Sequence, residues 1–277
     1  MRDQKNTMFR IFIVILLFTF AAFIIIPFLW MFSTTLRMPK NSFTLPPKIF
    51  PTEFMLDSYI LVFQKVPFAS FFLNSIKVAA FVTGLQLVTC SMSAYAFARL
   101  NFPGKNIIFM CFLGAMMIPA QVTNIPQFIF MSKLHLINSH AALIIPTIFS
   151  PLAIFLIRTY MLSIPKSMDE AAYIDGAGKV WTYLRIILPM SRPSLMVVGV
   201  LTFIGSWNDF YRPLIFINDT VKMTLPLGLT ALRGVLGTGN QSSLLAGVML
   251  SMIAPLLFYI FAQRYLVEGA NMSGLKG

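Results

Sequence analysis

The sequence is poor in charged residues and in cysteine. Charged residues make up 11% of the 277 positions and hydrophobic residues make up 57%. A soluble globular domain carries roughly 25% charged residues, so this composition excludes one and calls for lipid as the solvent of most side chains. The two cysteines, Cys90 and Cys111, both lie in apolar runs, which predicts buried thiols rather than a disulfide.

Acidic residues are also scarce, which leaves a formal net charge of +12. The basic residues are scattered singly through loops and the ends of apolar runs and form no stripe, so they do not indicate nucleic-acid binding. Contacts with anionic lipid head groups and with a cytoplasmic protein partner explain the excess of basic residues better than nucleic-acid binding does.

Catalytic, metal and nucleotide patterns are missing. His135 and His140 flank a short turn, a spacing more typical of solvated surface than of a ligand set. The segment before Lys179 is glycine-rich, but Tyr173 stands where a phosphate loop needs glycine and Val180 where it needs Ser or Thr. We therefore expect no catalytic residues, no metal site and no bound cofactor on this chain.

What the sequence has instead is long apolar runs, several of which reach the roughly 20 residues that a helix needs to cross a bilayer. The first run is too long for a signal peptide and lacks a cleavage site, so it is a retained span. The predicted fold class is an all-α integral membrane protein, one transmembrane domain over 1–277 with about six transmembrane helices. The predicted spans are Ile11–Met31, Leu73–Phe97, Ile107–Met131, Ala141–Met161, Pro193–Phe216 and Leu244–Tyr265.

Prolines interrupt two of these spans. Pro119 and Pro126 should break the third, and Pro146 and Pro151 the fourth. Backbone freed at such breaks is tolerated in a membrane only where protein or a water-filled path covers it. These spans should therefore face the interior of the bundle.

The distribution of Lys and Arg agrees weakly with a cytoplasmic N-terminus. Six spans then place the segment 163–193 and the C-terminal tail 267–277 in the cytoplasm, the tail as a flexible end. The proline-rich segment 33–72 becomes an ordered extracytoplasmic loop on the membrane surface.

The segment 163–193 is the one long polar interruption in the second half of the chain. It predicts two short helices joined by a turn at Gly176, the first opened by a capping box of Ser167 and Glu170. In the second helix one apolar stripe recurs at helical spacing, and prolines close the element. The stripe residues are Val180, Tyr183, Leu184 and Ile187, and the prolines are Pro189 and Pro193.

This segment resembles the EAA loop of ABC-importer permeases. The resemblance rests on Glu170-Ala171-Ala172, Gly176 six positions after the glutamate, Ile186 and Leu188-Pro189. It implies a type I importer permease architecture in which the loop docks into a cleft of a separate ATPase subunit. Glu170 would pair there with a basic residue of the ATPase, or would only cap its own helix. The coupling residues so implied are Asp169, Glu170, Ala171, Ala172, Asp175, Gly176, Ala177, Tyr183, Ile186, Leu188 and Pro189.

Two polar sets inside the apolar runs are candidates for a substrate path. Ionisable and aromatic residues at 206–212 supply rings beside amide and carboxylate groups, with Arg212 as the partner of Asp209; the alternative is an interfacial aromatic belt with a local ion pair. The second set lies at the broken third span and consists of Gln121, Thr123, Asn124 and Gln127. It either lines a cavity or makes hydrogen bonds between helices. The path candidates are Gln121, Asn124, Trp207, Asn208, Asp209 and Tyr211.

Softer features narrow the resemblance to the maltose-type, carbohydrate branch: the tail 267–277, the proline-rich outer loop, Trp207-Asn208-Asp209 and Leu225–Leu229. The resemblance implies a permease subunit that moves a di- or oligosaccharide across the bacterial cytoplasmic membrane, with both termini cytoplasmic. It also implies a second permease subunit (a homodimer is less expected), two ATPase subunits holding ATP and Mg, and an extracytoplasmic sugar-binding protein. The alternatives are an ABC permease for a non-sugar solute and an ion-coupled secondary carrier, although no inverted repeat is evident.

Overall fold

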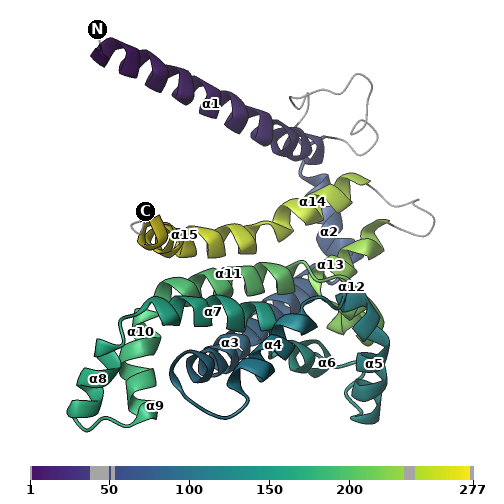
Figure 1. Ribbon diagram of the computed structural model, residues 1–277. Helices are drawn as coiled ribbons and strands as arrows, with labels where there is room; N and C mark the ends of the chain where they lie inside the picture. Colours follow the sequence, from purple (N-terminus) through teal and green to yellow (C-terminus); the bar gives the residue numbers. More distant parts are fainter. Residues whose placement is uncertain (1, 38–49, 51–53, 234–240, 275–277) are drawn as a thin grey trace. The chain divides into compact units, whose positions relative to one another are not determined.

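A computed structural model describes residues 2–37, 50, 54–233 and 241–274 (Figure 1). All regular secondary structure in these residues is helical, which confirms the predicted fold class. The described chain forms two compact units, one from Met1–Phe68 with Leu229–Met252 and one from Ala69–Gly228 with Ile253–Gly277. A single domain over 1–277 stays a prediction.

Unit 1 contains a helix that is apolar on every side. Its elements are α1 (Arg2–Thr35), α2 (Asp57–Lys65), η5 (Thr230–Arg233) and α14 (Gln241–Ser251). The side chains of α1 are exposed from Phe9 to Leu29, as expected of a helix whose surroundings are lipid. Its end is polar and buried: the hydroxyls of Thr35 and Tyr59 lie 2.8 Å apart and join α1 to α2.

Unit 2 is built around α3. Small buried residues of α3, Cys90, Ala94 and Ala98, allow α7 to approach closely, and Ile154 and Ile157 of α7 fill the contact. The elements of unit 2 are α3 (Phe68–Arg99), α4 (Lys105–Ala115), α5 (Ala120–Lys133), α6 (Ala141–Ile144), η2 (Ile145–Thr147), α7 (Pro151–Ser163), α8 (Ser167–Ile174), α9 (Lys179–Thr182), η3 (Tyr183–Ile187), α10 (Leu188–Met190), α11 (Arg192–Trp207), α12 (Tyr211–Phe216), η4 (Thr220–Lys222), α13 (Leu225–Leu229) and α15 (Ile253–Gly274).

Three described helices are long and apolar enough to cross a membrane, and two bent pairs raise the number to five. The long ones, Phe9–Thr35, Phe68–Arg99 and Gln241–Gln263, match the first, second and sixth predicted spans. The pairs Ala141–Thr147 with Pro151–Ser163 and Lys179–Met190 with Arg192–Trp207 bend by 43° and 75°. The third predicted span is instead two short helices, α4 and α5.

The proline predictions for the third and fourth spans have mixed outcomes. Pro119 stands just before α5 with an extended backbone, and Pro151 opens α7, so both mark helix breaks as predicted. Pro126 was expected to break the third span, but it lies inside α5, where a proline removes one helical hydrogen bond without ending the helix.

Helices extend into the predicted loop 33–72 and into the predicted tail 267–277. α1 runs to Thr35 and α3 begins at Phe68, so both ends of the segment 33–72 are helical, and 38–49 and 51–53 lie outside the described residues. The tail expected to be flexible is helical as far as Gly274, and 275–277 lie outside the described residues.

The break in the fourth span is covered by protein. Gln86 donates from Nε2 to the carbonyl of Thr147 at 2.9 Å, and the Thr89 hydroxyl donates to the carbonyl of Ile148 at 2.6 Å. Both donors lie on α3. Side chains of a neighbouring helix thus satisfy the freed backbone, as a break in a membrane requires.

Gly228→Ala tests the packing of α13 on α3. A Cβ at Gly228 would clash with the ring of Phe71, which is fully buried. We expect a loss of about 1–3 kcal/mol of unfolding free energy from overpacking, visible as a lower melting temperature in detergent. Gly84→Ala is the control, because a Cβ there meets nothing within 4 Å; equal melting temperatures for the two variants would contradict this packing.

Candidate functional site

The segment 163–193, which we call the elbow, folds as two helical arms joined by a glycine turn (Figure 1). The first arm is α8 and the second runs from α9 through η3 to α10. Gly176 has φ +77°, a left-handed conformation that glycine adopts at little cost. The predicted pair of short helices and their turn are confirmed.

The predicted capping box at the start of the elbow is wrong. The residue before α8 is Lys166, and Ser167 is already helical, with no side-chain hydrogen bond capping the helix. The backbone of Lys166 is itself in the helical region (φ −66°, ψ −24°), so no extended residue precedes the helix to act as a serine cap. Glu170, which the box would have used, is exposed.

The apolar stripe of the second arm divides between two surroundings. Tyr183 and Ile187 are buried, whereas Val180 and Leu184 are 72% and 51% exposed. One edge of the predicted stripe therefore meets the bundle, and the other edge is exposed. The arm contains a single π-helical stretch at Tyr183–Ile187, just before Pro189, whose missing N–H cannot continue the α-helical pattern.

Two tyrosines hold the second arm against α3. The Tyr183 hydroxyl lies 2.7 Å from the hydroxyl of Ser91, in a buried position, and the Tyr95 hydroxyl donates to the carbonyl of Lys179 at 3.0 Å. The two rings lie 5.1 Å apart, in contact. Ser91 and Tyr95 are one helical turn apart, so a single face of α3 makes both contacts.

The first arm is held by Arg99, one further turn along the same face of α3. Its Nη2 donates to the carbonyl of Ile164 at 2.8 Å, and its Nε lies 3.4 Å from Oδ2 of Asp169. The Arg99 side chain is 6% exposed and that of Asp169 27%. This shielded ion pair fixes α8 at the end of α3.

The residues implied as coupling residues thus divide into an inner and an outer set. Ala172 and Tyr183 are buried, and Asp169 is engaged with Arg99, so these three hold the elbow in place. The outer set is exposed: Glu170, Ala171, Asp175 and Gly176. Ala177, Ile186, Leu188 and Pro189 are half-buried.

Large apolar side chains that the sequence reasoning did not single out extend the outer set. Tyr173 and Ile174 are 81% and 83% exposed, and Trp181 is 52% exposed. Together with Val180 and Leu184 they make an exposed apolar surface on both arms, of the kind that marks an interaction site. The signal was available, because Tyr173 and Ile174 end a helix just before a glycine turn.

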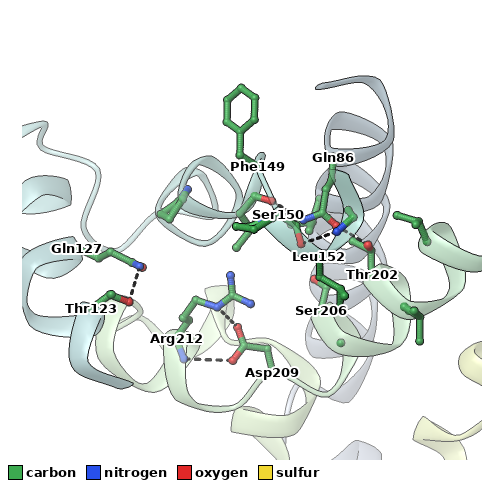
Figure 2. A pocket seen from close by; sticks show the side chains of 18 of the residues that line it. Gln86, Thr123, Gln127, Phe149, Ser150, Leu152, Thr202, Ser206, Asp209 and Arg212 are labelled. Atoms are coloured by element: carbon green, nitrogen blue, oxygen red, sulfur yellow. Dashed lines mark hydrogen bonds and ion pairs between the residues drawn. The ribbon is translucent and has the colours of Figure 1, made fainter. Parts of the chain in front are cut away.

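Unit 2 also contains a cavity of about 480 Å³. Figure 2 shows three polar pairs around it, each drawn from a different part of the chain. They are Gln86 of α3 with Thr202 of α11, Thr123 with Gln127 on α5, and Asp209 with Arg212 at the start of α12. The break between η2 and α7 supplies a further part of the wall, which includes Phe149 and Ser150.

Four of the six predicted path residues line this cavity: Gln121, Asn124, Asp209 and Tyr211. Trp207 and Asn208 are outside its lining. Trp207 is buried, with its ring in contact with those of Phe72 and Phe203. Asn208 is exposed at the end of α11.

Asp209 lies at a helix break, although the sequence placed it well along the fifth span. α11 ends at Trp207 and α12 begins at Tyr211. Oδ2 of Asp209 lies 2.6 Å from Nε of Arg212, and Oδ1 accepts the Arg212 backbone N–H at 3.3 Å. The carboxylate therefore satisfies both a cation and an amide freed at the start of a helix, which stabilises its charge.

Gln86 and Thr202 also line the cavity, although the sequence analysis did not predict either as a site residue. The Thr202 hydroxyl donates to Oε1 of Gln86, whose amide nitrogen donates to the carbonyl of Thr147. Gln86 thereby joins α11 to the break in the fourth span. A lone glutamine within an apolar run was the available signal, since polar side chains in membrane helices bond between helices.

Gln86→Leu should lower stability by about 1–3 kcal/mol, because the half-buried carbonyl of Thr147 and hydroxyl of Thr202 both lose their partner. The melting temperature of the purified protein measures this. Gln121→Leu is the matched control: Gln121 lines the same cavity but is exposed. A smaller shift for Gln86→Leu than for Gln121→Leu would contradict the bridging role.

Comparisons with known proteins agree with this geometry. Residues 86–270 match the family model described as the binding-protein-dependent transport system inner membrane component. The arabinooligosaccharides transport system permease protein of Halalkalibacterium halodurans is 35% identical over 267 residues, which is 94% of each chain. The trehalose/maltose transport system permease protein of Thermococcus litoralis is 31% identical and covers 99% of each chain.

Among solved structures, a chain of a bacterial ABC transporter involved in the import of the acidic polysaccharide alginate has the same fold. Its TM-score is 0.83 at 22% identity, over 95% of this chain and 98% of that chain. The family match covers more than half of the sequence and includes α7, the elbow, α11 and most of the cavity lining. The chain belongs to the family of binding-protein-dependent transport system inner membrane components, the permease subunits of ABC importers.

Proposed function

We propose that this permease moves a di- or oligosaccharide into the cell, through the cavity of unit 2. The cavity carries the proposal, because it lies among broken helices and is lined by amides, hydroxyls and one internally neutralised ion pair. Amides and hydroxyls can donate to and accept from the hydroxyl groups of a sugar. Tyr211 and Phe149 add aromatic faces to the lining.

The names of the relatives support the same substrate class. The two described above transport arabinooligosaccharides and trehalose or maltose, and a galactooligosaccharides transport system permease protein of Bacillus subtilis is 32% identical over 95% of this chain. The sugars in these three names are uncharged. An uncharged solute suits a cavity whose one described carboxylate is paired with an arginine.

In the proposed mechanism the elbow couples transport to ATP. ATP with Mg would be bound and hydrolysed by two separate ATPase subunits, and the exposed side of the elbow would dock on one of them. Three features support this: the apolar side chains exposed on both arms, the exposed carboxylate of Glu170, and the inner set that ties the elbow to α3. A rigidly held elbow transmits a displacement where a loose one would absorb it.

α7 leads into the elbow and α11 leads out of it, and both also line the cavity. A movement of the elbow would therefore reach the cavity wall directly through these two helices. Such a unit has two states, one favoured by nucleotide and the other by a loaded binding protein. The proposed assembly comprises a second permease subunit, two ATPases and an extracytoplasmic sugar-binding protein, with both termini of this chain in the cytoplasm.

Glu170→Lys should abolish sugar-stimulated ATP hydrolysis, because it reverses the exposed charge that would meet a basic residue of the ATPase. The measurement is ATP hydrolysis by the complete transporter in proteoliposomes, with and without sugar and binding protein. The control is Asp57→Lys, a charge reversal in the first turn of α2. Wild-type stimulation in Glu170→Lys, with the subunit inserted, would overturn the coupling role.

Asn124→Ala should reduce sugar uptake about fivefold, the effect of losing roughly one hydrogen bond to the solute. Asn208→Ala is the matched control, because Asn208 is not part of the cavity lining. Uptake of labelled oligosaccharide into proteoliposomes measures both variants. If Asn208→Ala lost uptake and Asn124→Ala kept it, the solute would not pass through this cavity.

A further inference from the structure

A second hollow, of about 590 Å³, lies at the end of α3 that holds the elbow. The last turn of α3, the turn after it, the start of α4 and the end of α7 form its walls. Its lining residues are Phe97, Asn101, Phe102, Gly104, Lys105, Asn106, Ile107, Arg158 and Leu162. None of them belongs to the elbow or to the cavity of the proposed sugar path.

Two cationic side chains of this hollow, Arg158 and Lys105, contact backbone carbonyls and an aromatic ring but no negatively charged group. Arg158 donates from Nε to the carbonyl of Phe97 at 3.2 Å, and its guanidinium carbon lies 4.1 Å from the centre of the Phe109 ring. Lys105 donates from Nζ to the carbonyl of Leu100 at 2.8 Å. These contacts fix the positions of both cations at the wall of the hollow.

No carboxylate of the described residues forms an ion pair with either of them. The three ion pairs of the described part of the chain involve Arg99, Arg212 and Lys222 instead. Burial lowers the pKa of Lys105, and the positive charges of Arg158 and Lys166 lower it further. Both cations line one hollow without a described carboxylate as partner, so an anion bound between them would offset two like charges.

The rim of the hollow is apolar. Ile107, in the first turn of α4, is 65% exposed, and Leu162, in the last turn of α7, is 47% exposed. The exposed amides of Asn101 and Asn106 lie on the same lining and can donate hydrogen bonds. Cations, amides and exposed apolar side chains therefore meet at the end of a span, where a bilayer has its head groups.

We propose that this hollow binds the head group of an anionic phospholipid. Its phosphate would lie between Arg158 and Lys105, and its acyl chains would cover Ile107 and Leu162. Basic pockets between helices on the cytoplasmic side of membrane proteins bind anionic head groups in this way. A free phosphate ion would satisfy the cations but leave the apolar rim uncovered, so the lipid is the occupant that fits both parts.

The test is native mass spectrometry of the full-length protein purified with its transporter partners in detergent. Phosphatidylglycerol and phosphatidylcholine are added as probes, and bound lipid is counted. We expect phosphatidylglycerol to be retained in preference to phosphatidylcholine. Lys105→Gln should weaken this retention about fivefold, and adding Arg158→Gln should weaken it about fivefold more.

Two controls separate a specific site from general attraction and from misfolding. Lys133→Gln removes an exposed cation at the end of α5, elsewhere in unit 2, and should leave retention unchanged. Arg158→Lys keeps the charge and should retain most of the lipid, whereas a variant that merely failed to fold would lose its partners as well.

Three outcomes would overturn the proposal. Retention that is the same in Lys105→Gln/Arg158→Gln as in the wild type would mean that these cations do not hold the lipid. Complete displacement by inorganic phosphate at equal concentration would mean a site for free anions. Absence of bound phosphatidylglycerol from the wild-type complex, with retention by the subunit freed of its ATPase, would mean that the ATPase covers the hollow.

Discussion

The hydrogen bonds that α3 makes to the interrupted parts of unit 2 are the interactions on which the rest depends. Helices that are broken in a membrane leave backbone carbonyls without water to bond to, at a cost of several kcal/mol for each. Gln86 and Thr89 satisfy the carbonyls at the break before α7. Further along the same helix, Tyr95 and Arg99 satisfy carbonyls in the elbow. A continuous helix thus supports the discontinuous ones.

This arrangement joins the cavity to the elbow. The cavity and the elbow lie at different levels of α3, and α7 and α11 run between them. Gln86 accepts a hydrogen bond from Thr202 of α11 and donates one to the carbonyl of Thr147, at the break before α7. A displacement of α7 or α11 would therefore move residues of the cavity wall. A permease needs a cavity whose walls are helices that can move as bodies, and breaks that are satisfied by side chains allow such movement without exposing backbone to lipid.

The division of the elbow into an inner and an outer set has a physical basis. A helix can bury only the side that faces the helices it packs on. Tyr183 and Ile187 lie on that side and pack on the bundle, while Val180 and Leu184 lie at the edge of the same apolar stripe and remain exposed. In a protein that otherwise exposes its apolar residues to lipid, such a surface on a polar segment is unusual, and it suits a soluble partner. The ion pair of Arg99 with Asp169 adds a shielded charge contact to the inner set.

The sequence by itself determined the helical class, the long apolar helices of the first, second and sixth spans, the two-armed elbow with its turn at Gly176, and four of the six path candidates. These follow from local causes: hydrophobic length, proline and glycine chemistry, and polar residues in apolar runs. Only the tertiary structure decided which side chains face inward. It buried Trp207 against Phe72 and Phe203, engaged Asp169 with Arg99, and brought Gln86 next to Thr202. The partners Phe72, Arg99 and Thr202 lie far away in the sequence, on neighbouring helices. A periodic pattern along one helix carries no information about which helix will meet it.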